Sequence, residues 1–551
     1  MTYLAPRTEL ATHSVFNQSE PMTDINWYRD DLILSGAVEH AGGGIHRDHL
    51  EHFGALTGRS ETLEAGRQAN ENPPKFKPYD RFGQRIDEVE FHPSYHELMD
   101  LGLSNQVASA AWTHDEAGHV LHSALIILMG HVDSGVCCPQ SMTYACVSAL
   151  KTQDWTQGWV EGATSGRYDP RFRPAEDKTG LTLGMAMTEK QGGSDVRANT
   201  TQAIAINADE VELTGHKWFC SAPMSDAFLT LAYEEDSADT GLSCFLVPRW
   251  QPDGTRNAIE IQRLKDKLGD RSNASSEIEY KSAWARRLGE PGRGVRTIID
   301  MVNHTRLDCI VGSAGQVRQA SALAVWHADR RAAFQRRLVD QPLMREVLAE
   351  LSMESEALLT LGFRVAESFD KAPANPHEAA LARILTPLAK YWVCKRTPYL
   401  IYEAMEAHGG AGYVEEHPLP RLFRQSPLNA IWEGSGNVIA LDVLRALHRD
   451  NTAREALKEE LNQARGHFTA LDERIETVLK LIEDGFSEAQ ARQFGELTAT
   501  ALTAAALIRA ELDPVAEAYV KRRIIENPTT LGASALAIDS ETLIARTRLQ
   551  A

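Results

Sequence analysis

The spacing of apolar residues changes twice along this 551-residue chain, and that change constrains the fold more than any other feature. Between residues 94 and 150, apolar side chains recur every three or four positions, which indicates helices packed by one face. Near Leu181 the pattern becomes a polar–apolar alternation, which is typical of half-buried strands. From Arg296 onward the helical period returns and persists. The sequence therefore predicts a mainly α protein with one β domain in its middle.

The middle region contains four short alternating runs bounded by Asp, Gly, Pro and Ser, and it ends near residues 280–284. Such runs predict strands of an antiparallel sheet or of a barrel. The runs cover residues 200–206, 211–218, 228–232 and 243–247. Long helices are expected after this region, over residues 294–330, 340–371, 376–408 and 437–448.

Two outer segments complete the chain. Residues 73–93 begin with Pro73-Pro74 and contain polar turns, which predicts an irregular surface segment. In the tail, Ser487 and Gln490 resemble a capping box that opens a helix, and an Ala-rich helix is expected over 495–512. Before that box, one apolar stripe predicts a single long helix through Leu457, Leu461, Ala464, Phe468, Leu471, Ile475, Leu479 and Ile482.

Length, charge and cysteine content narrow the function classes. The length predicts three or four domains. A net charge of −19 gives the chain no global attraction for nucleic acid or anionic membrane, although a local basic patch remains open. Seven cysteines without a C-x-x-C pair indicate reduced thiols in a cytoplasmic protein and argue against metal sites. The N-terminus lacks a signal-peptide core, and the longest apolar run, 124–129, is too short to span a bilayer.

The stretch from residue 402 to residue 437 is the strongest candidate for chemistry. Gly409, Gly410 and Gly412 end a helix and let the backbone turn sharply close to a ligand. Further along, Glu433 stands between Trp432 and a glycine. In an apolar pocket its pKa would be raised, which suits a general base near neutral pH. The alternative interpretation is a helix end, a loop and a solvated glutamate.

A second motif lies where the helical part gives way to strands. Residues 187–195, MTEKQGGSD, form a loop whose backbone N–H groups and hydroxyls suit a pyrophosphate. Lys217 to Ser221 then place aromatic rings and a hydroxyl on one strand, where a ring could pack on a flat ring system and the serine could bond a ring nitrogen. Each motif alone also has a purely structural interpretation.

Together these segments resemble the acyl-CoA dehydrogenase family over residues 100–445, in the family's order. MTEKQGGSD and EAMEAHGGAGYVEE-x4-R correspond to its two signature patterns, and IWEGSGN resembles its catalytic-glutamate segment. Arg331-Ala332-Ala333-Phe334 resembles the turn that reaches the FAD of a neighbouring subunit. Asn303-His304-Thr305-Arg306 resembles the helix segment that binds CoA.

A closer resemblance is to the AidB branch of this family, which is associated with the adaptive response to DNA alkylation. It rests on the N-terminal extension with Asn72-Pro73-Pro74, the loop KLGDRSNAS from Lys267 to Ser275, and the helical tail. The resemblance implies a mainly α fold with a central β-barrel domain, one FAD per subunit and a homotetramer. The implied domains are an N-terminal helical domain (1–180), the β domain (181–290), a C-terminal four-helix bundle (291–445) and an extra helical domain for DNA binding or oligomerisation (446–551).

The resemblance also assigns roles to residues. Glu433 would remove the α-proton of an acyl thioester, and flavin N5 would accept the β-hydride. Ser221 would hydrogen-bond the flavin, and Asn303 and Arg306 would bind CoA. The implied FAD-binding residues are Met185, Met187, Thr188, Gly193, Ser194, Phe219, Cys220, Ser221, Arg331, Phe334, Ile431, Trp432, Gly434, Ser435 and Asn437. Without the resemblance, an alternative interpretation of Arg331, a surface charge on a helix, is equally good.

Several positions depart from the family pattern. A bulkier ring at Trp432 would narrow the acyl pocket, and Gln425 would remove an ion pair. FAD binding is therefore better supported than efficient turnover, and the expected enzyme is a weak dehydrogenase that favours short or branched acyl-CoA. The departures are Phe219 for a ring-stacking tryptophan, Asn303 for an acid, Gln335 for a glycine, Gln425 for an aspartate, Trp432 for a tyrosine and Ser435 for a threonine.

The AidB-type resemblance implies a second function, in which the tail binds double-stranded DNA and dehydrogenation is vestigial. The cluster Lys521-Arg522-Arg523, with Arg546 and Arg548, would form the basic stripe. Against this, residues 451–551 carry 12 lysines and arginines but 16 acidic residues, and net acidity disfavours phosphate binding. The alternative interpretation of the cluster is a solvated helix face.

Overall fold

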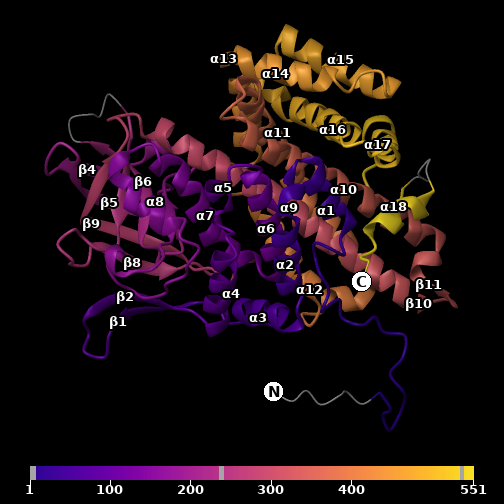
Figure 1. Cartoon of the computed structure of the whole chain (residues 1–551), viewed down its shortest axis with the longest axis horizontal. Helices are drawn as coiled ribbons and strands as arrows, with labels where there is room; N and C mark the ends of the chain where they lie inside the picture. The colour runs from indigo at the N-terminus through magenta and orange to yellow at the C-terminus, as the bar shows by residue number, and fades with distance from the viewer. Residues whose placement is uncertain (1–7, 235–240, 534–538, 551) are drawn as a thin grey trace.

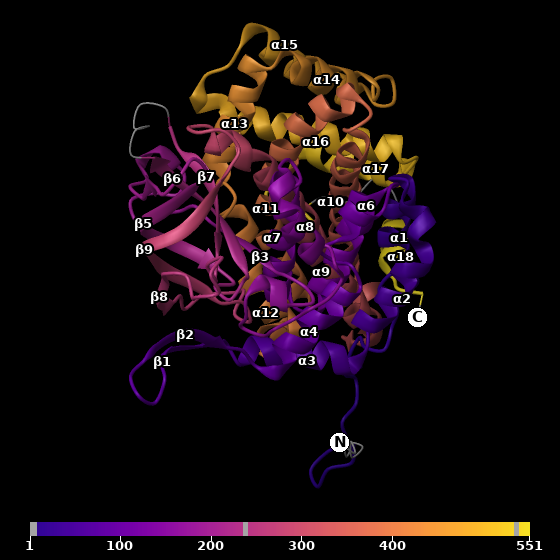
Figure 2. The same cartoon turned by 60° about the vertical axis from the view of Figure 1, so that its left-hand side comes forward.

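The computed structural model describes residues 8–234, 241–533 and 539–550. A β domain lies at one side of the molecule, and long helices fill the rest (Figure 1). The helices of residues 451–519 pack along the outside of this helical part, away from the chain's N-terminal arm, whereas the last helix, residues 540–547, lies beside the first (Figure 2). The predicted order of helices, sheet and helices is confirmed.

The β domain is a closed barrel. The alternating runs left an antiparallel sheet and a barrel open, and the barrel is correct. Its strands are β3 (Leu183–Ala186), β4 (Gln202–Ala205), β5 (Glu210–Ser221), β6 (Ala227–Glu234), β7 (Ser243–Pro248), β8 (Ile259–Leu264) and β9 (Ser275–Leu288). The strands β6, β4, β5, β9 and β7 pair in that order, and the circle closes because β7 also pairs with β6. The predicted strands correspond to β4, β5, β6 and β7.

One ion pair is buried inside this domain, and it holds the MTEKQGGSD loop. Lys217 Nζ of β5 lies 2.9 Å from Glu189 Oε1, and both side chains are fully buried. Glu189 also accepts hydrogen bonds from the backbone and hydroxyl groups of Thr200 and Thr201. Burial alone would raise the pKa of Glu189, but the Lys217 charge and these hydrogen bonds lower it to about 2.

We expect Lys217→Met to destabilise the β domain by about 3–5 kcal/mol, because it leaves the Glu189 carboxylate buried without its cation. Thermal unfolding with and without added FAD measures the effect. Lys190→Met is the matched control, because Lys190 lies in the same loop but is exposed. Equal unfolding temperatures for the two variants would contradict this prediction.

The helical part contains the long helices expected from the sequence, nearly residue for residue. They are α9 (Gly294–Arg330), α10 (Pro342–Lys371), α11 (Pro376–Ala407) and α13 (Gly436–Arg449). Proline at the first position starts α10 and α11, and the Asn375 side chain caps α11 by accepting from two backbone N–H groups. The N-terminal helices are α1 (Leu32–His40), α2 (Arg47–Thr57), α3 (Ser60–Glu71), α4 (Pro93–Ser104), α5 (Ala110–Thr113), α6 (Gly118–Val132), α7 (Ser134–Leu150) and α8 (Gln157–Ala163).

Two expectations about the outer segments are wrong. Residues 73–93 contain a hairpin of β1 (Lys75–Tyr79) and β2 (Arg85–Glu90), which the prolines concealed. The apolar stripe of the tail is split between α14 (Asn451–Asn462) and α15 (Thr469–Asp484), because Gly466 adopts a left-handed φ of 88° between them. The capping box of Ser487 and Gln490 is confirmed. The remaining helices are α12 (Pro418–Gln425), α16 (Ala491–Arg509), α17 (Asp513–Tyr519) and α18 (Ser540–Thr547).

The two arginines at the centre of the tail's basic cluster, Arg522 and Arg523, face α10 and not the solvent. Arg522 and Arg523 are buried and pair with Glu350, and Arg523 also pairs with Glu354. Arg546 pairs with Glu356 of α10. Arg548 pairs with Asp329 of α9 and with Glu541. The prediction that Arg522 and Arg523 bind DNA is therefore wrong, since a phosphate backbone cannot reach buried guanidinium groups. Lys521 lies beside Glu526, with 3.8 Å between the charged atoms.

Across residues 8–234, 241–533 and 539–550, no helix has both the length and the apolar character required to cross a membrane. Nor do the described residues bring together three or more histidines, cysteines or acids in a group that could bind a metal. All seven cysteines are free, and all but Cys137 are buried.

Candidate functional site

A cavity of about 810 Å³ lies between the barrel and the helical part. Its walls come from α6, α7, α9, the segment 424–438 and the barrel strands β3 and β5. Residues from both sequence motifs therefore meet at one place. The predicted site residues that line the cavity are Met185, Met187, Thr188, Gly193, Ser194, Phe219, Ser221, Arg306, Ile431, Trp432, Glu433, Gly434 and Ser435.

Glu433 forms part of the cavity wall in an unusual backbone conformation. Its φ is +56°, in the left-handed region that non-glycine residues rarely adopt. Its Oε2 accepts a hydrogen bond of 2.8 Å from the Thr305 hydroxyl of α9. Burial raises the pKa of Glu433, while the Thr305 hydrogen bond and the charges of Arg306 and Lys390 act in the opposite direction. The arrangement supplies a fixed carboxyl group with proton affinity above that of a solvated glutamate.

Lys390 of α11 fixes the loop that carries Glu433. Its ammonium group is buried and donates to the carbonyl oxygens of Asn429, Trp432 and Gly434 at 2.9, 3.0 and 3.0 Å. These three hydrogen bonds satisfy carbonyls that the irregular loop leaves without secondary-structure partners. Lys390 is a positioning residue that sequence reasoning missed, because nothing local links α11 to residues 429–434.

Arg306 supports the same loop from the opposite side. Its Nε donates to the Glu433 carbonyl oxygen at 3.1 Å, and its Nη1 lies 2.8 Å from Asp442 of α13. Arg383 pairs with the other oxygen of Asp442 at 2.9 Å. The structure therefore gives Arg306 a loop-holding contact, and its predicted role in binding CoA remains a prediction. Thr305, the neighbour that bonds Glu433, was also missed, although it lies inside the quoted Asn303–Arg306 segment.

The barrel wall of the cavity presents a ring and a hydroxyl. Phe219 is half exposed and lines the cavity, and Lys265 Nζ lies 4.7 Å from the centroid of its ring. Lys267 Nζ donates to Ser275 Oγ at 3.0 Å, and Ser275 Oγ lies 3.0 Å from Ser221 Oγ. A lysine ammonium group can only donate a hydrogen bond, so Ser275 accepts from Lys267 and can donate its own proton to Ser221. The hydroxyl proton of Ser221 is then available to a group in the cavity.

The turn of the glycine-rich loop is closely packed. A side chain at Gly193 would begin 2.8 Å from the Thr188 hydroxyl, so the loop requires glycine there. Trp432 completes the enclosure by packing with Met185 against Cys138, Met142 and Ala222. A flat ring system with hydrogen-bonding ring atoms fits between these surfaces, which is the shape that a flavin requires.

Five of the residues predicted to bind FAD or CoA do not line the cavity. The Cys220 side chain is buried in the barrel core, because neighbouring side chains on a strand point to opposite faces, and its predicted part in cofactor binding stays a prediction. Asn303 and Asn437 lie outside the wall, and Asn437 accepts a hydrogen bond from Arg492. Arg331 bonds the Asn17 carbonyl, and Phe334 is 94% exposed in a left-handed turn.

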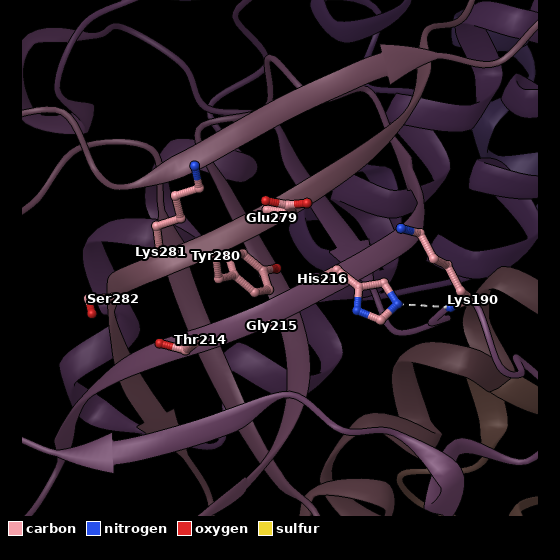
Figure 3. Close-up of a pocket in the computed structure, with 8 residues that line it drawn as sticks. All are labelled: Lys190, Thr214, Gly215, His216, Glu279, Tyr280, Lys281 and Ser282. Atoms are coloured by element: carbon pink, nitrogen blue, oxygen red, sulfur yellow. Dashed lines mark hydrogen bonds between the residues drawn. The ribbon is translucent and has the colours of Figure 1, made fainter.

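A second, open pocket lies on the outer face of the barrel (Figure 3). It is lined by residues of β5 and β9 together with Lys190, whose backbone N–H donates to His216 Nε2 at 3.1 Å. None of the predicted site residues line it, and its walls hold no enclosed carboxylate of the kind that Glu433 provides.

Comparison with protein families places three models along the chain. The adaptive response protein AidB N-terminal domain matches residues 17–170. The middle domain of acyl-CoA dehydrogenase matches residues 184–283, and the C-terminal domain of acyl-CoA dehydrogenase matches residues 292–448. The cavity lies where these three matched regions meet.

Individual relatives agree with the family models. The chain is 44% identical to AidB of Escherichia coli (strain K12), a provisionally named acyl-CoA dehydrogenase, over 84% of this chain and 86% of the relative. It is 31% identical to acyl-CoA dehydrogenase family member 11 of Caenorhabditis elegans, over 86% and 79%. The crystal structure of Caenorhabditis elegans ACDH-11 in complex with C11-CoA has a TM-score of 0.86 at 27% identity, covering 96% of both chains.

An acyl-CoA dehydrogenase of Bacillus anthracis complexed with FAD shares the fold, with a TM-score of 0.64 at 16% identity over 96% of this chain and 87% of that chain. The family consists of FAD-dependent oxidoreductases that act on CH–CH bonds. The order of the three matched domains and the match to AidB over most of the chain agree on the family of this protein. This chain belongs to the acyl-CoA dehydrogenase family, within its AidB-like branch, and its cofactor is FAD.

Proposed function

We propose that this protein dehydrogenates acyl-CoA thioesters and that Glu433 is the catalytic base. One observation carries the proposal: the Glu433 carboxylate is held in the cavity wall by Thr305, opposite the barrel surface of Phe219 and Ser221. As Glu433 takes the α-proton, the electron pair left on the α-carbon forms the new C=C bond while the β-hydrogen departs as hydride. The chemistry that FAD supplies when bound is acceptance of that hydride.

The residues proposed to hold FAD are those on the barrel side of the cavity. Phe219 would pack on the ring system, and the Ser221 hydroxyl would donate to a ring nitrogen. Thr188, Gly193 and Ser194 would follow the chain that leads to the pyrophosphate. The exposure of Phe334 at the end of a turn supports the proposal that Arg331 and Phe334 reach the cofactor of a second subunit in a homotetramer.

The substrate proposed from the sequence is a short or branched acyl-CoA. Anaerobic mixing with isovaleryl-CoA and with straight acyl-CoA esters up to eleven carbons tests this, since the ACDH-11 structure contains C11-CoA. Loss of the flavin's visible absorbance with any of these esters supports the dehydrogenase proposal, and the rates rank the acyl chains. An unchanged spectrum with every ester would contradict it.

The Thr305 hydroxyl should set the pH dependence of the reaction. Glu433 must be deprotonated to act as a base, so the rate falls as the pH drops through its raised pKa. The hydroxyl hydrogen bond lowers that pKa, so Thr305→Val should raise it and move the acidic limb of the pH–rate profile to higher pH. Thr305→Ser keeps a hydroxyl and should retain the wild-type limb. A Thr305→Val profile that coincides with the wild type would count against this role.

The proposal is confined to thioester chemistry. The sequence also suggested DNA binding through the tail and a part in the DNA alkylation response. Arg522 and Arg523 are committed to buried carboxylates, so the contacts of the tail give no support to DNA binding through this cluster.

A further inference from the structure

The cavity continues past Glu433 into the helical part. On α9 its lining residues recur every three or four positions from Val295 to Gln316, which corresponds to about 30 Å at 1.5 Å per residue. Val295 is 43% exposed, whereas Gln316 is 5% exposed, so the cavity is more enclosed at the Gln316 end of α9. Thr305, which bonds Glu433, lies near the middle. The lobe beyond Thr305, between α6 and α9, is the space that an acyl chain would enter.

Two hydrogen-bond acceptors interrupt this otherwise mainly apolar lobe. Asp308 Oδ2 and Gln316 Oε1 are buried, and neither has a hydrogen-bond partner among the described residues. Their neighbours in the lobe include Ile126, Ile127 and Gly312. A buried acceptor without a partner is costly, and natural proteins seldom leave one without a water molecule or a ligand to satisfy it.

His122 holds the Asp308 carboxyl group in place. The His122 ring is fully buried, its Nδ1 lies 2.6 Å from the Val107 carbonyl oxygen, and its Nε2 lies 2.8 Å from Asp308 Oδ1. A carbonyl oxygen only accepts, so Nδ1 carries a proton, and the contact between Nε2 and Oδ1 then requires one further proton between them. Wherever that proton resides, the pair has no net charge and Oδ2 remains an acceptor.

We propose that Asp308 recognises a neutral hydrogen-bond donor on the acyl chain, so that the preferred substrates are hydroxylated acyl-CoA thioesters. This rests on the proposed dehydrogenase function. A hydroxyl group supplies the donor that Oδ2 lacks, whereas an ammonium group would face a pair without net charge. Asp308 is only three residues beyond Thr305 on α9, or about 4.5 Å along the helix, so the recognised hydroxyl lies a few carbons from the thioester.

The test compares ω-hydroxyacyl-CoA esters of four to ten carbons with plain acyl-CoA esters of the same length. The readout is the second-order rate constant of anaerobic flavin reduction. We expect a preference of about tenfold for the hydroxylated ester at one or two chain lengths, the size of one good hydrogen bond. Asp308→Leu should remove the preference, and Gln316→Leu should leave it in place, because Gln316 lies eight residues, or about 12 Å, further along α9. Asp308→Asn should keep it, because the amide can donate to His122 and still present an oxygen to the cavity.

A second measurement separates this proposal from the proposed function. The Glu433→Gln variant is titrated with the same pairs of esters, and the change in flavin absorbance on binding gives Kd without turnover. If plain esters reduce the flavin but hydroxylated esters have no advantage in the rate constant of reduction or in Kd, the inference is overturned while the dehydrogenase function stands. Ordered water would then satisfy the buried acceptors. A preference that survives unchanged in Asp308→Leu would also overturn it. If no ester reduces the flavin but the Kd preference is present and depends on Asp308, the function fails and the recognition stands.

Discussion

Glu433→Gln should lower the rate of anaerobic flavin reduction by acyl-CoA by about 10²–10⁴-fold, the usual contribution of a positioned general base. Glutamine keeps the size of the side chain but cannot accept the α-proton. Its amide oxygen can still accept the Thr305 hydroxyl, which donates to the carboxylate in the wild type. We therefore expect the variant to fold, to retain FAD and to bind thioesters. Stopped-flow absorbance of the flavin measures the rate directly.

Glu415→Gln is the matched control, because Glu415 belongs to the same region of the chain but its side chain is largely exposed in an ion pair with Arg424. That variant should reduce its flavin at the wild-type rate. Rapid bleaching in Glu433→Gln would remove Glu433 from the mechanism and would leave the cavity without an identified base. Loss of FAD from the variant would instead indicate a structural role.

Arg523→Met should weaken the attachment of the tail by about 3–5 kcal/mol, the cost of removing one partner from a buried ion-pair network. Arg523 bridges Glu350 and Glu354 of α10, and both carboxylates are fully buried. Hydrogen–deuterium exchange of residues 513–526 reports local opening, which is more informative than a global unfolding midpoint for a chain of several domains. We expect exchange there to accelerate while α9 keeps its protection.

Arg465→Met provides the comparison, since its pair with Glu476 is exposed and such pairs contribute about 0–1 kcal/mol. If residues 513–526 exchange at the same rate in the Arg523→Met and Arg465→Met variants, the buried network does not attach the tail.

The long helices could be predicted because their signals are local. Periodicity and N-terminal prolines mark the starts of α10 and α11, and alternation marks the strands from β4 to β7. The prediction of a single helix through the apolar stripe of the tail is wrong because the spacing of apolar residues continues across Gly466, where the backbone turns. The β1–β2 hairpin could not be predicted, because prolines and charged residues obscured the strand pattern and the short pairing needs only a few backbone hydrogen bonds.

The site shows the same division. The glycine-rich loop, Phe219, Ser221 and Glu433 were found because their motifs are contiguous in the sequence. The partners that orient Glu433 were not found: Thr305 bonds Glu433 across 128 positions, and Lys390 bonds the Gly434 carbonyl oxygen across 44. Sequence pattern identifies a charge, but only the fold decides whether that charge meets solvent, a ligand or a buried carboxylate.

The left-handed backbone at Glu433 has an evolutionary consequence. A side chain at that φ costs about 1–3 kcal/mol, and glycine adopts the same conformation without that penalty. A glutamate codon becomes a glycine codon by a single base change. In a lineage selected for folding alone, the proposed base would therefore be among the easiest residues to lose. A glycine at this position in a related chain would mark a member that keeps the architecture without the proposed chemistry.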